Sequence, residues 1–117
     1  GGSGAGRKKL CEGVGENTID IANSSSRIKQ SDIDTCKANG VSIELNASPY
    51  RLDLDWRYIY DAMDKGIYVS INPDAHQIEG IRDMEYGVKV GRKGGLLRSL
   101  TLNALNVQDV KTFFKKA

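Results

Sequence analysis

The sequence predicts an α/β fold in which short parallel strands alternate with helices, about three strands and four helices in all. Three short runs rich in β-branched residues each end in polar or turn-forming residues, which is typical of strands. The segments between and after them carry apolar residues at helical spacing. Strands and helices of these lengths in alternation favour parallel β-α units joined by right-handed crossovers.

The first half of the chain predicts two strands and a helix. Residues 18–22 form a β-branched run that ends in a polar cluster, as a strand entering a loop does. A helix is expected at residues 30–38, with Ser31 as its N-cap and a stop at Gly40. Residues 41–46 alternate apolar and polar side chains, which indicates a second strand.

The second half predicts three helices and one strand. A helix is expected at residues 55–65, a strand at 67–71, a helix at 82–93, and a last helix that opens at Asn106. Two of these helices carry apolar stripes that we expect to face the core. The stripe residues are Trp56, Ile59, Tyr60 and Met63 in the first helix and Val107, Val110, Phe113 and Phe114 in the last.

The length limits how much of a barrel the chain holds. An eight-stranded β/α barrel needs about 250 residues, and this chain has 117. The alternatives are a small three-layer domain or a piece of a larger one, with residues 1–6 as a flexible linker and residues 7–117 as the folded part. In either case ligands are expected at the carboxyl ends of the strands.

Composition excludes some classes of protein. The net charge of +2 comes from 17 basic and 15 acidic residues, a balance too even to predict nucleic-acid binding from charge alone. The apolar runs are too short to span a membrane, and the glycine-rich start has no signal-peptide core. Cys11 and Cys36 lack metal-site spacing, so we expect reduced thiols in a cytoplasmic protein.

The end of the strand at 67–71 carries candidate metal ligands. Asp74 and His76 lie two residues apart just past this strand, where both can turn toward one point. Carboxylate and imidazole suit zinc, manganese or iron. His76 is the only histidine of the chain, so the remaining ligands of a closed site would have to be carboxylates or lie elsewhere.

A second polar group follows the strand at 41–46. Glu44 and Asn46 share one face of this strand because side chains alternate along it. That face points either into a barrel interior or, on an edge strand, to solvent. Arg51 and Arg57 could bind a phosphate in a bidentate manner, but ion pairs with the neighbouring aspartates explain them more simply.

Several ordered motifs resemble the PHP (polymerase and histidinol phosphatase) domain of bacterial family X DNA polymerases. Residues 44–57, ELNASPYRLDLDWR, are similar to that family's E-[IL]-N-A-N-P-x-R-L-D-L-D-W-R stretch. Residues 70–76, SINPDAH, resemble its strand and metal-binding turn, and residues 79–94 its following helix. The resemblance runs from about Val41 to the C-terminus and identifies the carboxy-terminal part of the domain.

This resemblance implies part of a distorted β/α barrel whose divalent metal ions, manganese or zinc, hydrolyse phosphate esters. Asp74 and His76 fall on two of the family's metal ligands. The parent protein would process DNA 3′ ends as an exonuclease, with the rest of the barrel and a polymerase domain in the same chain. The resemblance implies DNA as the partner, and it implies no contact with a membrane.

The amino-terminal third departs from the family pattern. Where the family has an H-P-T-G-R turn, residues 23–27 read NSSSR, so that Asn23 replaces a ligand and Arg27 alone survives. We therefore keep Arg27, Glu44, Asn46 and Arg51 as a candidate phosphate or strand-end polar site. The alternative function is a degenerate, non-catalytic structural or interaction module that holds no metal. A free-standing third of a barrel would also expose strand edges and apolar surface, so we expect either self-association or a rearranged packing.

Overall fold

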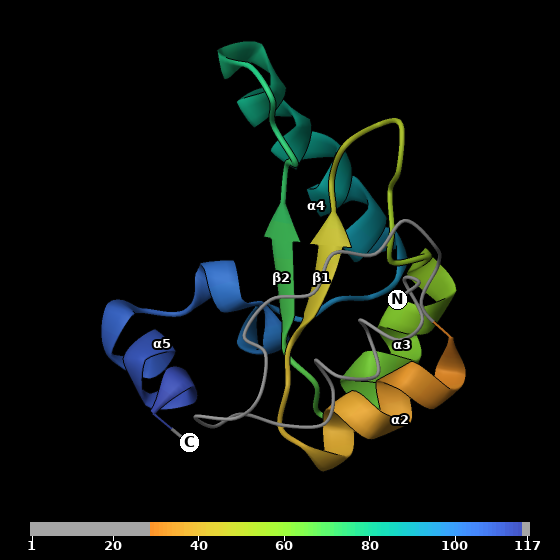
Figure 1. Ribbon diagram of the computed structural model, residues 1–117, viewed down its shortest axis with the longest axis vertical. Coiled ribbons are helices and arrows are strands. Elements are labelled where there is room, and N and C mark those ends of the chain that lie inside the picture. Colours follow the sequence, from red (N-terminus) through yellow and green to blue (C-terminus); the bar gives the residue numbers. More distant parts are fainter. Residues whose placement is uncertain (1–28, 116–117) are drawn as a thin grey trace, which may run out of the picture.

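The computed structural model describes residues 29–115 (Figure 1). Strands β1 (Ile43–Asn46) and β2 (Val69–Asn72) pair in parallel, and helix α3 (Trp56–Asp64) lies between them in the chain. Parallel strands joined through a helix are thus confirmed for this part of the chain. Two strands do not make a barrel, so the barrel stays a prediction, and the strand expected at 18–22 lies outside the described residues.

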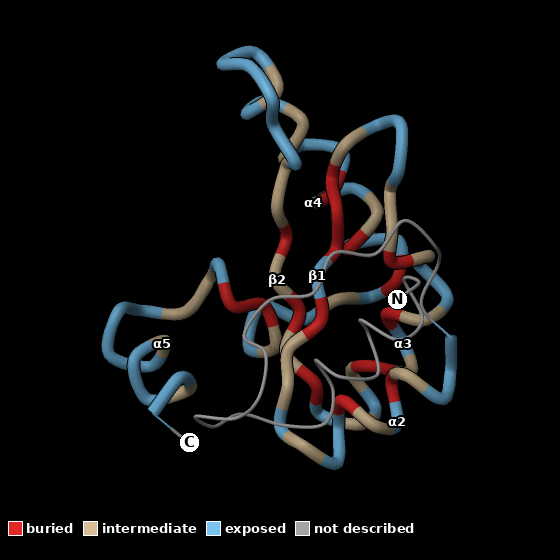
Figure 2. Tube along the Cα trace, viewed as in Figure 1, coloured by how far each residue is buried: buried red, intermediate tan, exposed pale blue. Residues whose placement is uncertain are grey.

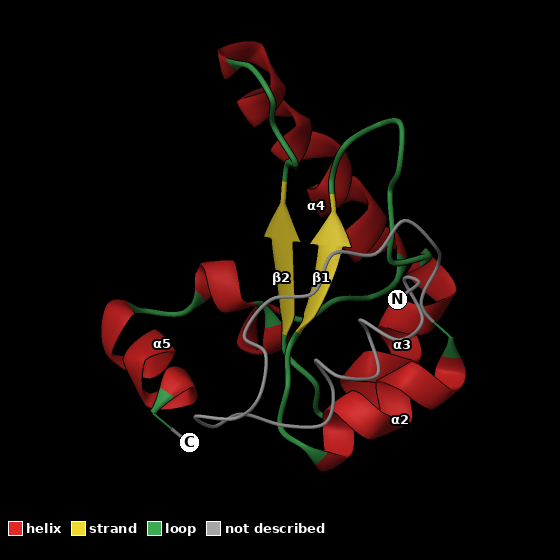
Figure 3. Cartoon of the chain, in the orientation of Figure 1, coloured by secondary structure: helices red, strands yellow, loops and turns green. Residues whose placement is uncertain are grey.

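The remaining helices follow the predicted order (Figure 3). Helix α2 spans Gln30–Ala38, α4 spans Met84–Lys93, and α5 spans Val107–Phe114. The expected helix at 82–93 differs at its start, because a 3-10 segment, Ile78–Asp83, precedes α4 and projects beyond the ends of both strands (Figure 1). Two short 3-10 turns, Arg98–Leu100 and Leu102–Ala104, link α4 to α5.

Side-chain bonds cap the starts of two helices, α3 and α5. The Asp55 carboxylate accepts the Arg57 backbone N–H at 3.0 Å at the start of α3, and the Asn106 amide oxygen accepts the Asp109 N–H at 2.9 Å at the start of α5. The prediction of Ser31 as N-cap is wrong, because α2 begins one residue before it. The stop at Gly40 is confirmed by its φ of +67°, which glycine adopts without strain.

The core lies between one face of the sheet and the helices (Figure 2). Leu45 and Val69 contribute fully buried side chains from the two strands, while Ile59 of α3 and Ile33 of α2 meet them from the helices. Cys36 of α2 belongs to the same core and is disulfide-bonded. The expectation of a reduced thiol at Cys36 is therefore wrong.

Several aromatic residues expected in the core lie at the surface. Trp56 is 40% exposed, Tyr60 69% and Phe114 67%, so the expectation that they face inward is wrong. Fully buried Ile59 and Ala62 already fill the space between α3 and its neighbours. The apolar stripes located the helices correctly, but neighbouring elements bury only part of each stripe.

The edges of the sheet are covered in part by the chain itself. The side-chain amide of Asn103 donates to the Ile71 carbonyl and accepts the Ile71 N–H, both at 2.8 Å, as a neighbouring strand would. At β1, the Asn46 N–H donates to the Asp53 carbonyl in the returning loop. These bonds weaken the argument for edge-to-edge association, which stays a prediction. No helix in the range 29–115 has the length and apolar character needed to cross a membrane.

Helix α4 packs against the strands through glycine. A Cβ added to Gly87 would lie 2.5 Å from the Ala47 Cβ and 2.6 Å from the Ile71 Cγ2. A Cβ on Gly91, one turn later, would lie 3.2 Å from the flexible end of Leu96 and at ordinary contact distance, 3.6 Å, from the Leu45 Cδ2 and the Leu96 Cβ. Gly87 therefore sets how closely α4 approaches the carboxyl ends of the strands.

We predict opposite effects for alanine at these two glycines. Alanine in a helix interior gains about 1 kcal/mol over glycine, but overpacking a core contact costs about 1–3 kcal/mol. Gly87→Ala should therefore lower the free energy of unfolding, while Gly91→Ala should leave it unchanged or raise it. Urea unfolding followed by circular dichroism measures both. Equal stabilisation by the two substitutions would contradict this packing.

Candidate metal centre at the carboxyl ends of the strands

The face of the sheet opposite the core is polar. Glu44 and Asn46 on β1 pair in register with Ser70 and Asn72 on β2. Hydrogen bonds join this group: the Asn72 amide donates to the Glu44 carboxylate at 3.3 Å, and the Ser70 hydroxyl donates to the Asn72 oxygen at 3.1 Å. Glu44 is exposed while Asn46 is buried. The two residues share a face, as alternation along the strand predicts.

Asn46 links the end of β1 to the loop after β2. Its side-chain nitrogen donates to the Asp74 carboxylate at 3.1 Å, and its oxygen accepts the Ser48 backbone N–H at 3.0 Å. Since a backbone N–H can only donate, the second bond fixes which end of the amide faces Asp74. Asn46 is 8% exposed, so this amide is a firm support for the Asp74 side chain.

His76 is oriented by the same loop. Its Nδ1 lies 2.8 Å from the Asp74 backbone carbonyl. A carbonyl only accepts, so this contact favours the neutral tautomer with the proton on Nδ1, in which Nε2 has the lone pair that binds a metal. Asp74 itself has a φ of +54°, a left-handed conformation that is uncommon for residues other than glycine and that aspartate tolerates better than most. Both side chains are exposed to solvent.

The candidate phosphate-binding arginines have local partners. Arg57 makes two bonds to the Asp55 carboxylate, at 2.9 and 2.8 Å, and this contact raises the pKa of the Arg57 guanidinium above its ordinary value. Arg51 pairs with Asp53 at 3.5 Å. The interpretation of these residues as local ion pairs is thus supported. Arg27 and Asn23 lie outside the described residues.

The donors fit a divalent metal in type but not in number. A carboxylate and an imidazole Nε2 suit zinc or manganese, yet a catalytic zinc site takes three protein ligands and a structural site four. Across residues 29–115, no three His, Cys, Asp or Glu side chains lie close enough together to hold an ion. Asp74 and His76 are therefore too few to hold an ion by themselves, and the metal site that they would belong to stays a prediction.

Sequence reasoning did not foresee the support from Asn46. The contact joins residues 28 positions apart, and it depends on the register that pairs Asn46 with Asn72. The available signal was that Asn46 ends one strand and Asp74 follows the next. The carboxyl ends of neighbouring parallel strands lie at the same edge of a sheet.

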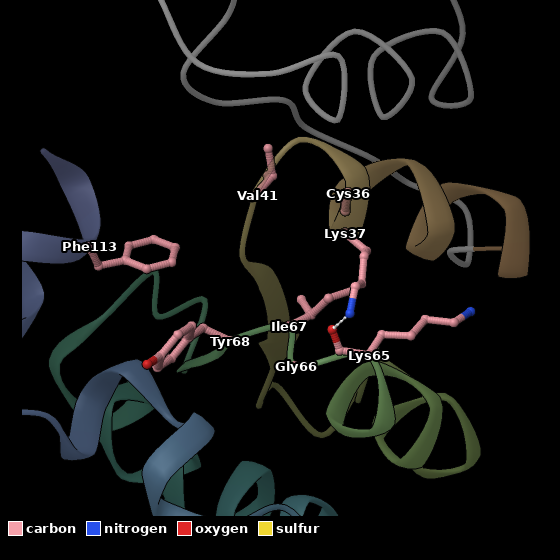
Figure 4. Close-up of a pocket in the computed structure, with 9 residues that line it drawn as sticks. Cys36, Lys37, Val41, Lys65, Gly66, Ile67, Tyr68 and Phe113 are labelled. Carbon is pink, nitrogen blue, oxygen red and sulfur yellow. Dashed lines mark hydrogen bonds between the residues drawn. The ribbon is translucent and has the colours of Figure 1, made fainter. Parts of the chain in front are cut away.

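A pocket lies at the other end of the sheet (Figure 4). Its walls come from the residues that precede both strands and from α5, where Tyr68 packs edge-to-face on Phe113 with ring centroids 5.1 Å apart. Its two lysines already have partners, because Lys37 donates to the Lys65 carbonyl and Lys65 pairs with Asp34. None of the predicted site residues lines this pocket, so the carboxyl ends of the strands remain the candidate site.

Comparison with known proteins identifies a relative. No family model matches the chain. Over 84 residues, 72% of its length, the chain is 39% identical to a Bacillus subtilis (strain 168) protein described as DNA polymerase/3'-5' exonuclease PolX. The aligned part is 15% of that protein. Together with the ordered motifs between Glu44 and Gly94, this identity shows that the chain is related to the bacterial family X DNA polymerases.

Proposed function

We propose that this chain is the C-terminal section of a metal-dependent phosphoesterase domain whose parent protein trims DNA 3′ ends. The observation that carries the proposal is the strand-end arrangement in which Asn46 holds Asp74, within a chain that is 39% identical over 84 residues to a polymerase and 3'-5' exonuclease. The rest of the barrel and a polymerase domain would then belong to the same parent chain, in the cytoplasm.

Each residue has a distinct role in this proposal. Asp74 supplies a carboxylate oxygen and His76 its Nε2 to a divalent ion, and Asn46 keeps the carboxylate in position. Such an ion, when bound, neutralises phosphate charge and lowers the pKa of a bound water. Glu44 adds negative charge on the polar face of the sheet, and Arg51, with Arg27, would contact the phosphate.

A second candidate function is a non-catalytic module beside a polymerase. The observation that favours it is the incomplete ligand set: Asp74 and His76 have no third His, Cys, Asp or Glu close by in the part of the chain that the structure describes. The substitution of Asn23 for a family histidine points the same way. This module would use the same fold and bind no metal at the strand ends.

Metal titration separates the two functions. We expect manganese or zinc to bind this chain weakly, because two protein ligands and solvent complete the coordination, and we expect His76→Ala to lower the affinity at least about tenfold by removing one ligand. Calorimetry measures this, with Gln77→Ala, an exposed neighbour, as the matched control. Equal binding by wild type and His76→Ala, or no binding by either, would support the non-catalytic module.

Asn46→Leu tests the positioning role. Loss of the amide donor leaves the Asp74 carboxylate without its support, and removal of such a group lowers metal affinity by about 10- to 100-fold. The control is Asn103→Leu, which removes an amide of the same size that bonds Ile71 and does not contact Asp74. It should lower stability without changing metal affinity. Equal losses of affinity in both variants would show that the Asn46 effect is only structural.

A further inference from the structure

Two aromatic side chains stand on the outer face of α3. Trp56 and Tyr60 are four residues apart, so they lie one above the other on the same side of the helix. They are 40% and 69% exposed, whereas Ile59 and Ala62 between and beyond them are fully buried. The two rings lie outside the buried core, and part of each is open to a ligand.

The end of α4 lies against this aromatic pair. The Lys93 ammonium sits 4.9 Å from the centre of the Trp56 ring. Gly94 makes the approach feasible, since a Cβ there would lie 2.7 Å from the Trp56 carbonyl oxygen and 2.8 Å from the Ile59 Cβ. Close helix packing therefore holds a cation over the ring of an exposed indole.

Positive charge continues from this point along the chain. Residues 86–108 contain four basic residues and no acidic one. Lys89 pairs with Glu85 at 2.6 Å, but Arg92, Lys93 and Arg98 are exposed and have no acidic neighbour within this stretch. Asp55, which precedes Trp56, is paired with Arg57, and Asp61 and Asp64 follow Tyr60 in the second half of α3. An anionic chain on this surface would therefore run from Trp56 toward the end of α4.

Exposed aromatic rings beside basic residues suit single-stranded nucleic acid. Any base can stack on an aromatic face, and the basic side chains follow the phosphates. A protein partner would also cover exposed rings, but the exposed Lys93 over the Trp56 ring, with exposed Arg92 beside it in the chain, favours a polyanion over a neutral surface. The net charge of the whole chain hides this local excess, because it averages the basic residues of 86–108 with the four aspartates of residues 53–64.

We propose that the surface formed by Trp56, Tyr60, Arg92 and Lys93 binds single-stranded nucleic acid without sequence preference, with a base stacked on the Trp56 indole. This surface is separate from the Asp74–His76 ligands, and its binding requires no metal ion. It would hold a strand outside the hydrolytic site, and its existence does not depend on the phosphoesterase activity proposed above.

The chain provides its own probe for this binding. Trp56 is its only tryptophan, so quenching of the intrinsic indole fluorescence reports stacking at this position alone. We expect a short oligothymidylate to quench the fluorescence in EDTA, with an affinity that falls as salt rises. Absence of quenching at low salt would overturn the proposal. EDTA removes divalent metal ions, so this result does not depend on the proposed metal site. If Asp74 and His76 bind no metal, binding of the oligothymidylate should be unchanged.

Variants identify the residues involved. In fluorescence anisotropy with a labelled oligothymidylate, Trp56→Ala should weaken binding about tenfold or more, while Trp56→Phe should restore much of it. Lys93→Gln should weaken binding and reduce the salt dependence. The matched controls are Phe114→Ala and Lys111→Gln, which remove an exposed ring and an exposed cation from α5.

The outcomes are decisive in both directions. Losses confined to Trp56→Ala and Lys93→Gln support the surface on α3 and α4. Equal losses in the α5 controls, or none in any variant, would overturn it in favour of diffuse electrostatic binding. Circular dichroism confirms that each variant is folded, and if Trp56→Ala is not, the wild-type quenching and Lys93→Gln still decide the matter.

Discussion

The parallel register of β1 and β2 determines where every group of the candidate site lies. Pairing of Asn46 with Asn72 brings the end of one strand beside the loop that follows the other, and this is what allows Asn46 to reach Asp74 at 3.1 Å. A slip of one residue would turn the polar face of each strand toward the core. The buried Leu45 and Val69 oppose such a slip, because they would have to leave the core. Packing of the apolar face thus determines which polar side chains lie together on the opposite face.

Glycine at helix contacts has a related effect on the outer surface. Gly87 lets α4 rest directly on Ala47 and Ile71, and Gly94 lets its end approach the backbone of α3. The space between α3 and α4 is then too narrow for large side chains, which leaves Trp56 exposed beside Lys93. The same close packing that positions the strand ends therefore also creates the aromatic and basic surface.

Local signals in the sequence were sufficient for much of the fold. Helix α2 has the predicted bounds, and the starts of α3 and α5 follow from Asp55 and Asn106, because caps depend only on neighbouring residues. Burial was less predictable, since periodicity shows which side of a helix is apolar and not how far its neighbours cover it. Trp56 and Tyr60 were misjudged for this reason. Asp74 and His76 stay predicted ligands, from their place after a strand and from family resemblance, whereas the Asn46 contact required the strand register.

Paramagnetic broadening by manganese in a nitrogen-15 NMR spectrum tests the central claim most directly. The account predicts that low manganese concentrations first broaden the backbone amides of residues 46–48 and 72–76, because a bound ion would lie between the end of β1 and the loop after β2. Helix α5, at the other end of the sheet, should be unaffected. Broadening centred on the acidic residues of α3, or spread evenly over the surface, would contradict a metal-binding role for the strand ends.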